Sequence, residues 1–454
     1  MKSTDRAKRF SENFKQRITR QQALALAACA HCGICADSCH YYKVTGDPKM
    51  TPAYKADRIR RVFKRQFDWT GRFIPWWVGA EAVSEDEQLE ELKEIFFGCC
   101  TGCRRCTINC PFGVDMAGLV SLTRSLLIDE NMGPTGLIKV MRDQWTTGNQ
   151  MAISDQDYLE TLRWLQEEVR EELDDPGVTI PVDKKGADFL YIVNPREIKY
   201  APMSLMAATK IFHSAGLNWT MGSKGWDNTN YGLFSGKADL GRHMCNLAFT
   251  QAKILGVKQL VVSECGHGFR SMKWEAPIWG VKVETPIQVV SVLQLLAELI
   301  SRGIIALDPR RNPLPVTYHD PCSLSRSSGL TEEPRYCLRR ACLDFREMTP
   351  NRINSYCCTG GGGALSMTEY TPLRLRVTRI KASQIAATGA VSVVTSCHNC
   401  ADGLADVIKA NKLTAEVEPG VHRPVTVRTV CDCVANALIL DSVSKQPLEP
   451  SKKL

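Results

Sequence analysis

Apolar side chains recur at helical spacing through the first third of the chain. Residues 1–28 are rich in basic side chains, and residues 116–175 carry leucines at helical spacing before a charged segment from Gln156 to Leu173. Pro176 and Gly177 then interrupt the pattern, as such residues do where a helix ends. We therefore predict a helical N-terminal region that ends in a linker. The apolar face predicted for residues 1–28 consists of Phe10, Phe14, Ile18, Leu24 and Leu26.

Beyond that linker, short apolar segments alternate with helix-like ones, which is the pattern of an α/β fold. The predicted strands are 189–193, 260–262, 316–318 and 391–395. The predicted helices are 203–215, 287–300, 334–344 and 373–387, the second of them opened by Pro286. Two consecutive alternations of about 120 residues each predict a duplicated unit with parallel sheets.

These patterns predict an α+β multi-domain protein. Its expected parts are a helical N-terminal extension (1–28), a helical domain (29–175), a first α/β unit (186–305), a second α/β unit (313–440) and a polar tail (441–454). The helical domain contains an aromatic-rich insertion from Phe67 to Trp77 that includes Trp69 and Trp76. Because aromatic clusters are usually buried, we predict a core position, with contact to a partner or a membrane surface as the alternative.

The composition is that of an ordinary globular protein. Of 454 residues, 44% are hydrophobic and 23% are charged, which excludes intrinsic disorder. The net charge of +8 favours docking against an acidic protein or a membrane face over nucleic-acid binding. No run of 18 apolar residues is present, and the residues before Cys29 lack the apolar core of a signal peptide. We therefore expect a cytoplasmic chain.

The 20 cysteines are the most informative feature of the composition. Two runs stand out, Cys29-x2-Cys32-x2-Cys35-x3-Cys39 and Cys100-x2-Cys103-x2-Cys106-x3-Cys110-Pro111. Such spacing in a long chain indicates a reducing compartment and metal clusters rather than a disulfide scaffold. Runs of three cysteines with a distant fourth are typical of [4Fe-4S] clusters, whereas zinc sites use other spacings.

The two runs resemble those of bacterial two-cluster ferredoxins. That resemblance implies a two-[4Fe-4S] ferredoxin-like domain whose cubane clusters are ligated crosswise, because the fourth cysteine of each run ligates the other cluster. His40 stands where such runs usually have proline, and Cys99 is a spare thiol beside the second run. The first cluster is then expected on Cys29, Cys32, Cys35 and Cys110, and the second on Cys100, Cys103, Cys106 and Cys39.

A further group of cysteines lies in the last third of the chain. It consists of His319-Asp320-Pro321-Cys322, Cys357-Cys358-Thr359 followed by four glycines, and Cys397-His398-Asn399-Cys400. The pattern resembles the CCG domain of heterodisulfide reductase and its relatives, apart from Thr359 between the cysteine pair and the glycines. A phosphate cradle at the glycines is disfavoured, because no Lys-Ser/Thr pair follows them. The resemblance implies a noncubane [4Fe-4S] cluster that splits disulfides, held by Cys322, Cys357, Cys358, Cys397 and Cys400.

The first α/β unit resembles a degenerate copy of the same domain. Asn194 stands where the opening cysteine belongs, residues 227–232 replace the adjacent pair, and Cys265 alone remains of the C-x2-C motif. We expect this unit to bind no cluster by itself. Cys265 or His267 is a candidate to face the catalytic cluster across the domain interface, and a structural thiol is the alternative. The remaining cysteines are predicted to lie in the core: Cys245, Cys337, Cys342, Cys431 and Cys433.

A double ferredoxin joined to one intact CCG unit resembles the iron–sulfur subunits of membrane respiratory complexes in sulfate reducers. That family implies a heterodisulfide reductase-like oxidoreductase, attached peripherally to the cytoplasmic membrane through partner subunits that include a quinone-reactive cytochrome b. Electrons are expected to pass through two cubanes to the noncubane cluster and to reduce a disulfide or trisulfide on a small protein partner, or to run in reverse. One alternative is the iron–sulfur subunit of a flavin-dependent glycolate, lactate or glycerol-3-phosphate dehydrogenase, which normally keeps two CCG copies. A scaffold with structural clusters is another.

Overall fold

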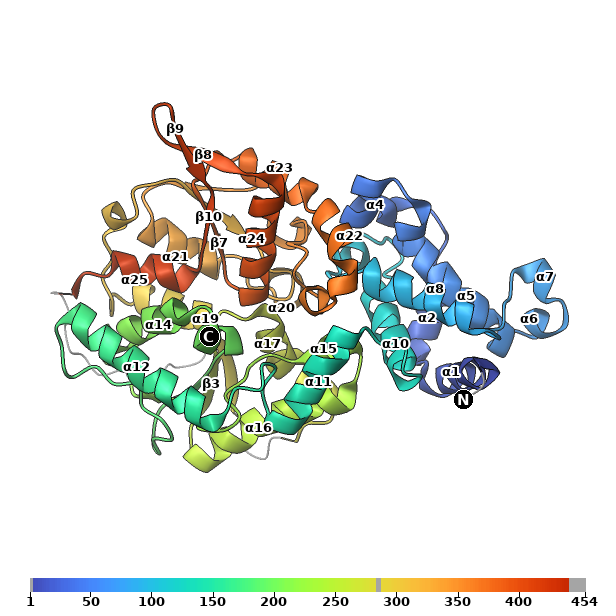
Figure 1. Ribbon diagram of the computed structural model, residues 1–454, viewed down its shortest axis with the longest axis horizontal. Coiled ribbons are helices and arrows are strands. Elements are labelled where there is room, and N and C mark those ends of the chain that lie inside the picture. The colour runs from blue at the N-terminus through green and yellow to red at the C-terminus, as the bar shows by residue number, and fades with distance from the viewer. Residues whose placement is uncertain (1–2, 283–286, 441–454) are drawn as a thin grey trace.

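The computed structural model describes residues 3–282 and 287–440, so Pro286 and the predicted tail lie outside the described residues. Figure 1 shows a helical region at the right and a larger α/β region at the left. The helical region consists of α1 (Ser3–Arg17), α2 (Arg20–Ala28), α3 (Ile34–Ser38), α4 (His40–Thr45), η1 (Pro48–Met50), α5 (Pro52–Phe67), α6 (Trp69–Phe73), α7 (Pro75–Val78), α8 (Asp86–Lys93), η2 (Glu94–Gly98), α9 (Arg105–Ile108) and α10 (Met116–Asp129).

The predicted apolar face of the N-terminal extension is confirmed in part. Phe10, Phe14 and Leu26 are fully buried in the core of the helical region. Leu24, however, is 69% exposed. The reason is that Thr19 starts a new helix with a reciprocal capping box, so that the periodicity of α1 does not continue into α2.

The aromatic insertion is exposed, and its predicted core position is wrong. The helices α6 and α7 project from the end of α5 at the right edge of the molecule (Figure 1). The side chains of Phe73, Trp76 and Trp77 are 74%, 78% and 80% exposed. These residues extend past the last helix that packs on α5, so no layer of the helical core reaches them within the described residues.

Two helices connect the regions and pack on the α/β side. α11 (Thr135–Thr147) lies against α15 (Tyr231–Ser235) and α16 (Ala238–Leu255) of the first α/β unit, and α12 (Asp155–Leu173) lies against α14 (Pro202–Ser214). Tyr158 and Leu165 of α12 belong to the same hydrophobic core as the strands of that unit. α11 and α12 therefore pack as part of the first α/β unit, although the helical domain was expected to extend to residue 175.

The α/β region contains two four-stranded parallel sheets, as the duplicated pattern predicted. In the first, β1 (Phe189–Ile192), β2 (Trp219–Thr220), β3 (Gln259–Val262) and β4 (Gln288–Ser291) have the order β2-β1-β3-β4. In the second, β5 (Val316–His319), β6 (Phe345–Arg346), β7 (Ser392–Thr395) and β10 (Thr426–Arg428) have the order β10-β7-β5-β6. Read from opposite ends, both orders place the first and third strands of the unit at the centre of the sheet. The two units therefore share their central strand pairing. A separate antiparallel hairpin is formed by β8 (Thr414–Glu418) and β9 (Val421–Pro424).

Helices cover both sheets, and two predicted helices differ from the observed ones. The segment predicted as helix 287–300 forms strand β4 and then α19 (Val292–Ser301), and the segment 373–387 forms the two helices α22 (Thr371–Arg376) and α23 (Arg379–Ala386). The first unit has α13 (Pro195–Lys199), α14 (Pro202–Ser214), α15 (Tyr231–Ser235), α16 (Ala238–Leu255), α17 (Gly266–Arg270), η3 (Ser271–Glu275), α18 (Ala276–Ile278) and α19 (Val292–Ser301). The second has η4 (Pro309–Arg311), α20 (Ser325–Ser328), α21 (Glu333–Ala341), η5 (Arg352–Asn354), η6 (Ala364–Ser366), η7 (Thr368–Tyr370), α22 (Thr371–Arg376), α23 (Arg379–Ala386), α24 (His398–Asn411) and α25 (Val430–Ala437).

The carboxyl ends of the two sheets face each other. The backbone N–H of His398, after β7, donates to the carbonyl of Glu264, after β3, at 3.1 Å. The Glu264 carboxylate in turn accepts from the N–H groups of Val430 and Cys431 at 2.8 and 3.2 Å. In parallel α/β sheets, ligand sites form at this edge. Among the helices that the structure describes, none has both the length and the apolar content that a bilayer span requires.

Candidate functional site

The first three cysteines of the first run lie on the loop around the start of α3. Cys29, Cys32, Cys35 and the distant Cys110 line one cavity, together with Cys106. Burial raises the pKa of the Cys35 thiol, and the charges of Cys29, Cys110 and Cys32 raise it further. The fourth cysteine of the second run thus lies with the first three of the first run, as crosswise ligation requires.

The second run forms a more deeply buried group. Cys39, Cys100, Cys103 and Cys106 line a second cavity, together with the spare thiol of Cys99. Burial raises the pKa of Cys39, and the nearby ammonium group of Lys55 opposes that rise. Lys55 is 2% exposed and donates to the carbonyls of Cys99 and Met50 at 2.7 and 3.0 Å. A buried cation therefore faces the group at which thiolate charge would collect.

Two arginines connect this second group to the α/β region. The guanidinium of Arg124 is buried and donates to the carbonyls of Cys100, Phe234 and Gly362 at 2.6, 2.7 and 2.8 Å. Arg326 donates to the carbonyl of Cys103 at 2.6 Å and also to those of Ile353 and Ser355. These contacts fix the loop of the second run against both α/β units.

The C-terminal cysteines come together from three segments. Cys322 follows β5, Cys357 and Cys358 lie on the loop after η5, and Cys397 and Cys400 lie at the start of α24. The sulfur atoms of Cys358 and Cys400 are 3.2 Å apart. Cys322 interacts electrostatically with Cys358 and Cys397, and burial raises its pKa to about 12. The structure thus gathers all five of the predicted thiols at one place.

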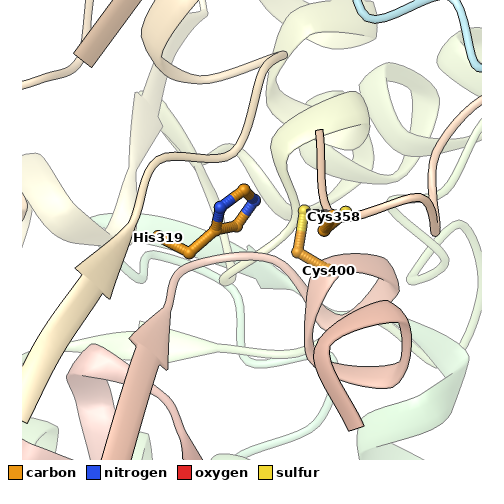
Figure 2. A group of neighbouring side chains, drawn as sticks. All are labelled: His319, Cys358 and Cys400. Carbon is orange, nitrogen blue, oxygen red and sulfur yellow. Dashed lines mark hydrogen bonds between the residues drawn. The ribbon is translucent and has the colours of Figure 1, made fainter. Parts of the chain in front are cut away.

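His319 belongs to the same group, although the sequence assigned it no role. Its ring, Cys358 and Cys400 place their ligand atoms within 4.8 Å of one another, and Figure 2 shows the ring beside the two sulfur atoms at the end of its strand. Within the described residues, its Nδ1 atom is buried without a hydrogen-bond partner. A buried imidazole nitrogen without a partner is chemically suited to a metal cluster or to a thiolate.

The glycines after the cysteine pair allow a close approach of backbones. A Cβ atom on Gly360 would lie 2.1 Å from the carbonyl oxygen of Asn399, and one on Gly362 would lie 2.4 Å from that of Thr101. Gly362 also has a φ of +65°, which side chains disfavour. The N–H groups of Thr359 and Gly360 point to the sulfur atoms of Cys357 and Cys358 at 3.2 and 3.4 Å.

The second run touches the C-terminal group directly. Cys103 and Cys357 lie within hydrogen-bonding reach of each other, and each changes the pKa of the other. The hydroxyl of Thr101 lies 3.3 Å from the Cys357 sulfur atom. The cysteine pair of the CCG motif is therefore adjacent to the ferredoxin-like region.

The corresponding edge of the first α/β unit is filled with polar side chains. Asn194 donates to the Cys265 sulfur atom at 3.6 Å, and Asp227 accepts from the N–H groups of Gln150 and Thr229 at 2.8 and 2.6 Å. Burial raises the pKa of Asp227 to about 6, although these hydrogen bonds oppose the rise. Gly268 stands where the second cysteine of C-x2-C belongs.

Cys265 and His267 lie at the boundary between the units. The sulfur atom of Cys265 is 3.5 Å from Nδ1 of His267. Both residues interact with Cys397, but only His267 lines the same cavity as Cys322 and Cys397, whereas Cys265 is fully buried. The residue that faces the C-terminal group across the interface is therefore His267.

The donor set fits iron–sulfur clusters. All 20 cysteines are free, and 13 of them converge in the three groups described above. Coordination to iron deprotonates thiols, including those, such as Cys35 and Cys322, whose pKa burial raises. The other predicted core cysteines, Cys245, Cys337, Cys342, Cys431 and Cys433, are buried.

Sequence reasoning missed the cations around these groups. Arg124 and Arg326 have no basic neighbour in the sequence, and a single cation carries no motif. Lys381 joins Lys55 and these two arginines as a fourth cation and is 1% exposed. Burial lowers its pKa to about 8, while the charges of Cys358 and Asp320 act in the opposite direction. Lys55 and Lys381 do lie in basic stretches, close to Arg58 and Arg379, but such stretches are usually solvated and did not mark these two lysines as buried.

The modules of the chain match two family models. A 4Fe-4S dicluster domain matches residues 25–114, and the cysteine-rich CCG domain matches residues 316–404. Fold and site together therefore define an iron–sulfur oxidoreductase subunit in which a ferredoxin-like module is joined to a CCG module.

Whole-chain relatives identify the family. The Hdr-like menaquinol oxidoreductase iron-sulfur subunit 2 of Archaeoglobus fulgidus is 30% identical over 412 residues, which are 81% of this chain and 73% of that protein. The D subunit of the dihydromethanophenazine:CoB–CoM heterodisulfide reductase of Methanosarcina barkeri is 28% identical over 423 residues, covering 91% of this chain and 96% of that protein. This chain belongs to the family of heterodisulfide reductase-like iron–sulfur subunits of the D type, as its cysteine pattern predicted. A solved structure of a hypothetical protein from Helicobacter pylori aligns over 96% of this chain and 76% of that one, with 11% identity and a TM-score of 0.45.

Proposed function

We propose that this chain is the catalytic iron–sulfur subunit of a quinone-linked membrane redox complex and that its C-terminal site reduces a disulfide or a trisulfide. The supporting observation is the gathering of five thiols beside a cavity of about 360 Å³. Cys322, Cys358, Cys397 and Cys400 line this cavity. Ile278, which also lines it, is 76% exposed, so the cavity reaches the surface.

The ligand sets proposed are those that the geometry groups together. Two cubane clusters would be held by the two crosswise quartets, and a noncubane cluster would be held by the five C-terminal thiols. When bound, such clusters supply one-electron transfer at the quartets and an iron that accepts a substrate thiolate at the C-terminal set. The contact between Cys103 and Cys357 supports this arrangement, because it keeps the second quartet beside the C-terminal site.

Reduction of a disulfide takes up two electrons and two protons and yields two thiols. The four cations Lys55, Arg124, Arg326 and Lys381 stabilise the negative charge that such chemistry brings into a buried site. Phe234 and His267 of the first unit line the side of the cavity opposite the CCG unit. A cavity of this size admits a small molecule or a thin peptide segment, and we propose a cysteine-bearing tail of a small protein.

The names of the relatives support the proposed partners. One is a subunit of a menaquinol oxidoreductase and another is a subunit of a dihydromethanophenazine-dependent heterodisulfide reductase. For this chain we propose a quinone-reactive cytochrome b partner and further subunits, with attachment at the cytoplasmic face of the membrane. The same site can oxidise a dithiol in the reverse direction, and the reduction potentials decide between the two.

Paramagnetic resonance tests the proposal. Anaerobically purified, iron-loaded protein is oxidised and mixed with a monothiol such as 2-mercaptoethanol. We expect a paramagnetic signal that requires Cys358 and is retained in the control variant Cys337→Ala, which removes a buried thiol of the same unit. A fully loaded protein that stays silent with the thiol would remove the proposed disulfide chemistry.

A further inference from the structure

The aromatic arm, defined here as residues 67–80, displays a set of large apolar side chains to solvent. Trp69, Phe73, Trp76 and Trp77 are 70%, 74%, 78% and 80% exposed, and Phe67 is 41% exposed. Figure 1 shows α6 and α7 projecting from the end of α5, away from both α/β units. Scattered exposed aromatics are ordinary, but here five of them lie within eleven residues and form an apolar tip at one end of the molecule.

Helix caps and hydrogen bonds to α5 hold the arm in place. Asp68 caps α6 through the N–H of Thr70, and Pro75 begins α7. Arg65 donates to the carbonyls of Gly71 and Arg72 at 3.1 and 2.8 Å, which closes the turn between α5 and α6. Lys64 donates to the carbonyl of Val78 at 3.0 Å and ties the far end of the arm back to α5. These bonds hold the backbone of the arm against α5.

Two glycines shape the turns of the arm. A Cβ atom on Gly71 would lie 2.2 Å from the carbonyl oxygen of Lys64, so this turn requires glycine. Gly79 ends α7 in the left-handed conformation with a φ of +64°. The two glycines are thus required by the turns. The exposed side chains of Phe73, Trp76 and Trp77 lie between them in the sequence.

The charges around the arm are mainly positive. Between residues 64 and 80, Lys64, Arg65 and Arg72 face a single acid, Asp68. Gln66 donates to the carbonyl of Ser11 at 2.7 Å, which places the base of the arm against the basic helix α1. On that helix Lys8 and Lys15 are exposed, but so are Asp5 and Glu12, so the excess of positive charge lies on the arm itself. An apolar tip with cations at its base is complementary to an apolar layer beneath anionic headgroups.

We propose that the aromatic arm inserts into the interfacial layer of a membrane that contains anionic lipids, so that this chain contacts the bilayer itself as well as its partner subunits. Tryptophan is the side chain that membrane interfaces favour, because its ring is apolar and its N–H can bond to headgroups. The arm projects from the surface of the molecule, as a membrane anchor does. A site for a partner's helix would instead be a groove. The proposal does not depend on the disulfide chemistry.

Vesicle sedimentation tests the proposal with the full iron-loaded chain. The probes are vesicles of phosphatidylcholine alone and vesicles of phosphatidylcholine and phosphatidylglycerol at a ratio of about three to one. We expect the chain to sediment with the anionic vesicles and the variant W76A/W77A to lose at least about tenfold in partitioning. The control W164A removes a tryptophan of α12 that is 50% exposed, and it should bind like the original chain.

Two further measurements decide the interpretation. Lipids brominated near the headgroup should quench the fluorescence of the original chain more than that of W76A/W77A, and added salt should weaken the binding. Both variants change exposed residues, and equal melting temperatures and iron contents would show that they fold. The proposal is overturned if the original chain does not bind anionic vesicles, or if W76A/W77A binds them equally well. Binding only to vesicles that hold a membrane-protein partner would also overturn it and would assign the arm to that protein.

Discussion

The two α/β units share a central strand pairing and differ at the edge where ligands bind. In the second unit, five thiols meet at the carboxyl ends of the strands, whereas in the first unit the same edge holds Cys265 among asparagine, aspartate and serine side chains. The first unit therefore has the same strand topology but lacks the thiols of the site. This comparison shows that the fold only brings loops together, and that the side chains on those loops decide the chemistry.

The first unit still contributes to the site of the second. Phe234, His267 and Arg270 line the cavity from the opposite side, and Glu264 holds the N-terminus of α25 through two hydrogen bonds. A degenerate copy that had no role would be free to lose these contacts. Its structure indicates that it serves as the wall against which the intact unit closes.

The largest effect is expected from Cys358→Ser. Because this thiol lies 3.2 Å from Cys400 in the centre of the group, its loss should remove the C-terminal cluster and lower disulfide reduction at least about 100-fold. Iron and sulfide analysis should show that the two quartets stay loaded. Cys337→Ala is the matched control, and an equal loss of activity in that variant would contradict the assignment.

Arg124→Met tests the connection between the two units and the helical region. The substitution leaves the carbonyls of Cys100, Phe234 and Gly362 without their buried donor, so the free energy of unfolding should fall by about 3–5 kcal/mol. Chemical denaturation measures this change. Arg124→Lys keeps the charge with fewer donors and should lose less; a loss equal to that of Arg124→Met would show that the retained charge contributes nothing and that the guanidinium donors account for the whole effect.

Asp227 makes the polar edge sensitive to pH. Its pKa in the folded protein is raised to about 6, above the value of about 3.9 for an unfolded chain, so the folded state binds the extra proton between these values. Relative to Asp227→Asn, the original chain should therefore lose stability as pH rises from about 4 to 6, by up to about 3 kcal/mol, and stay level above that range. Unfolding curves of both proteins at several pH values measure this difference. A constant difference between them would contradict the raised pKa.

Gly268→Cys restores one missing cysteine of the first unit and should restore no cluster. Its Cβ atom would lie 2.4 Å from the carbonyl oxygen of Asn228, so we expect a loss of about 1–2 kcal/mol and an unchanged iron content. Gly268→Ala separates the effect of the Cβ atom from that of the thiol and should cost about the same. Additional iron in Gly268→Cys would show that the degenerate edge can still open.

Cysteine spacing predicted the groups that the structure brings together, because metal-ligand runs are local patterns with few competing explanations. Strand β4 was predicted as the start of a helix, because the strand passes directly into α19 and its buried Val289 stands at helical spacing from Val292, Leu293 and Leu296 of that helix. A strand of four residues is too short for its own alternation to outweigh that helical pattern.

The aromatic arm and the buried cations could not be predicted for a different reason. Whether Trp76 is core or surface depends on whether another layer covers it, and that is a property of the tertiary structure. The contacts of Arg124 join residues more than 200 positions apart in the chain, from Cys100 to Gly362. Such long-range contacts leave no local trace in the sequence.

An anomalous difference map at the iron edge, from crystals grown without oxygen, tests the central claim most directly. The account predicts iron density at three places: within each crosswise quartet and among Cys322, Cys357, Cys358, Cys397 and Cys400. It predicts none beside Asn194 and Cys265. A map with iron in the quartets alone, or with iron at the edge of the first unit, would contradict it.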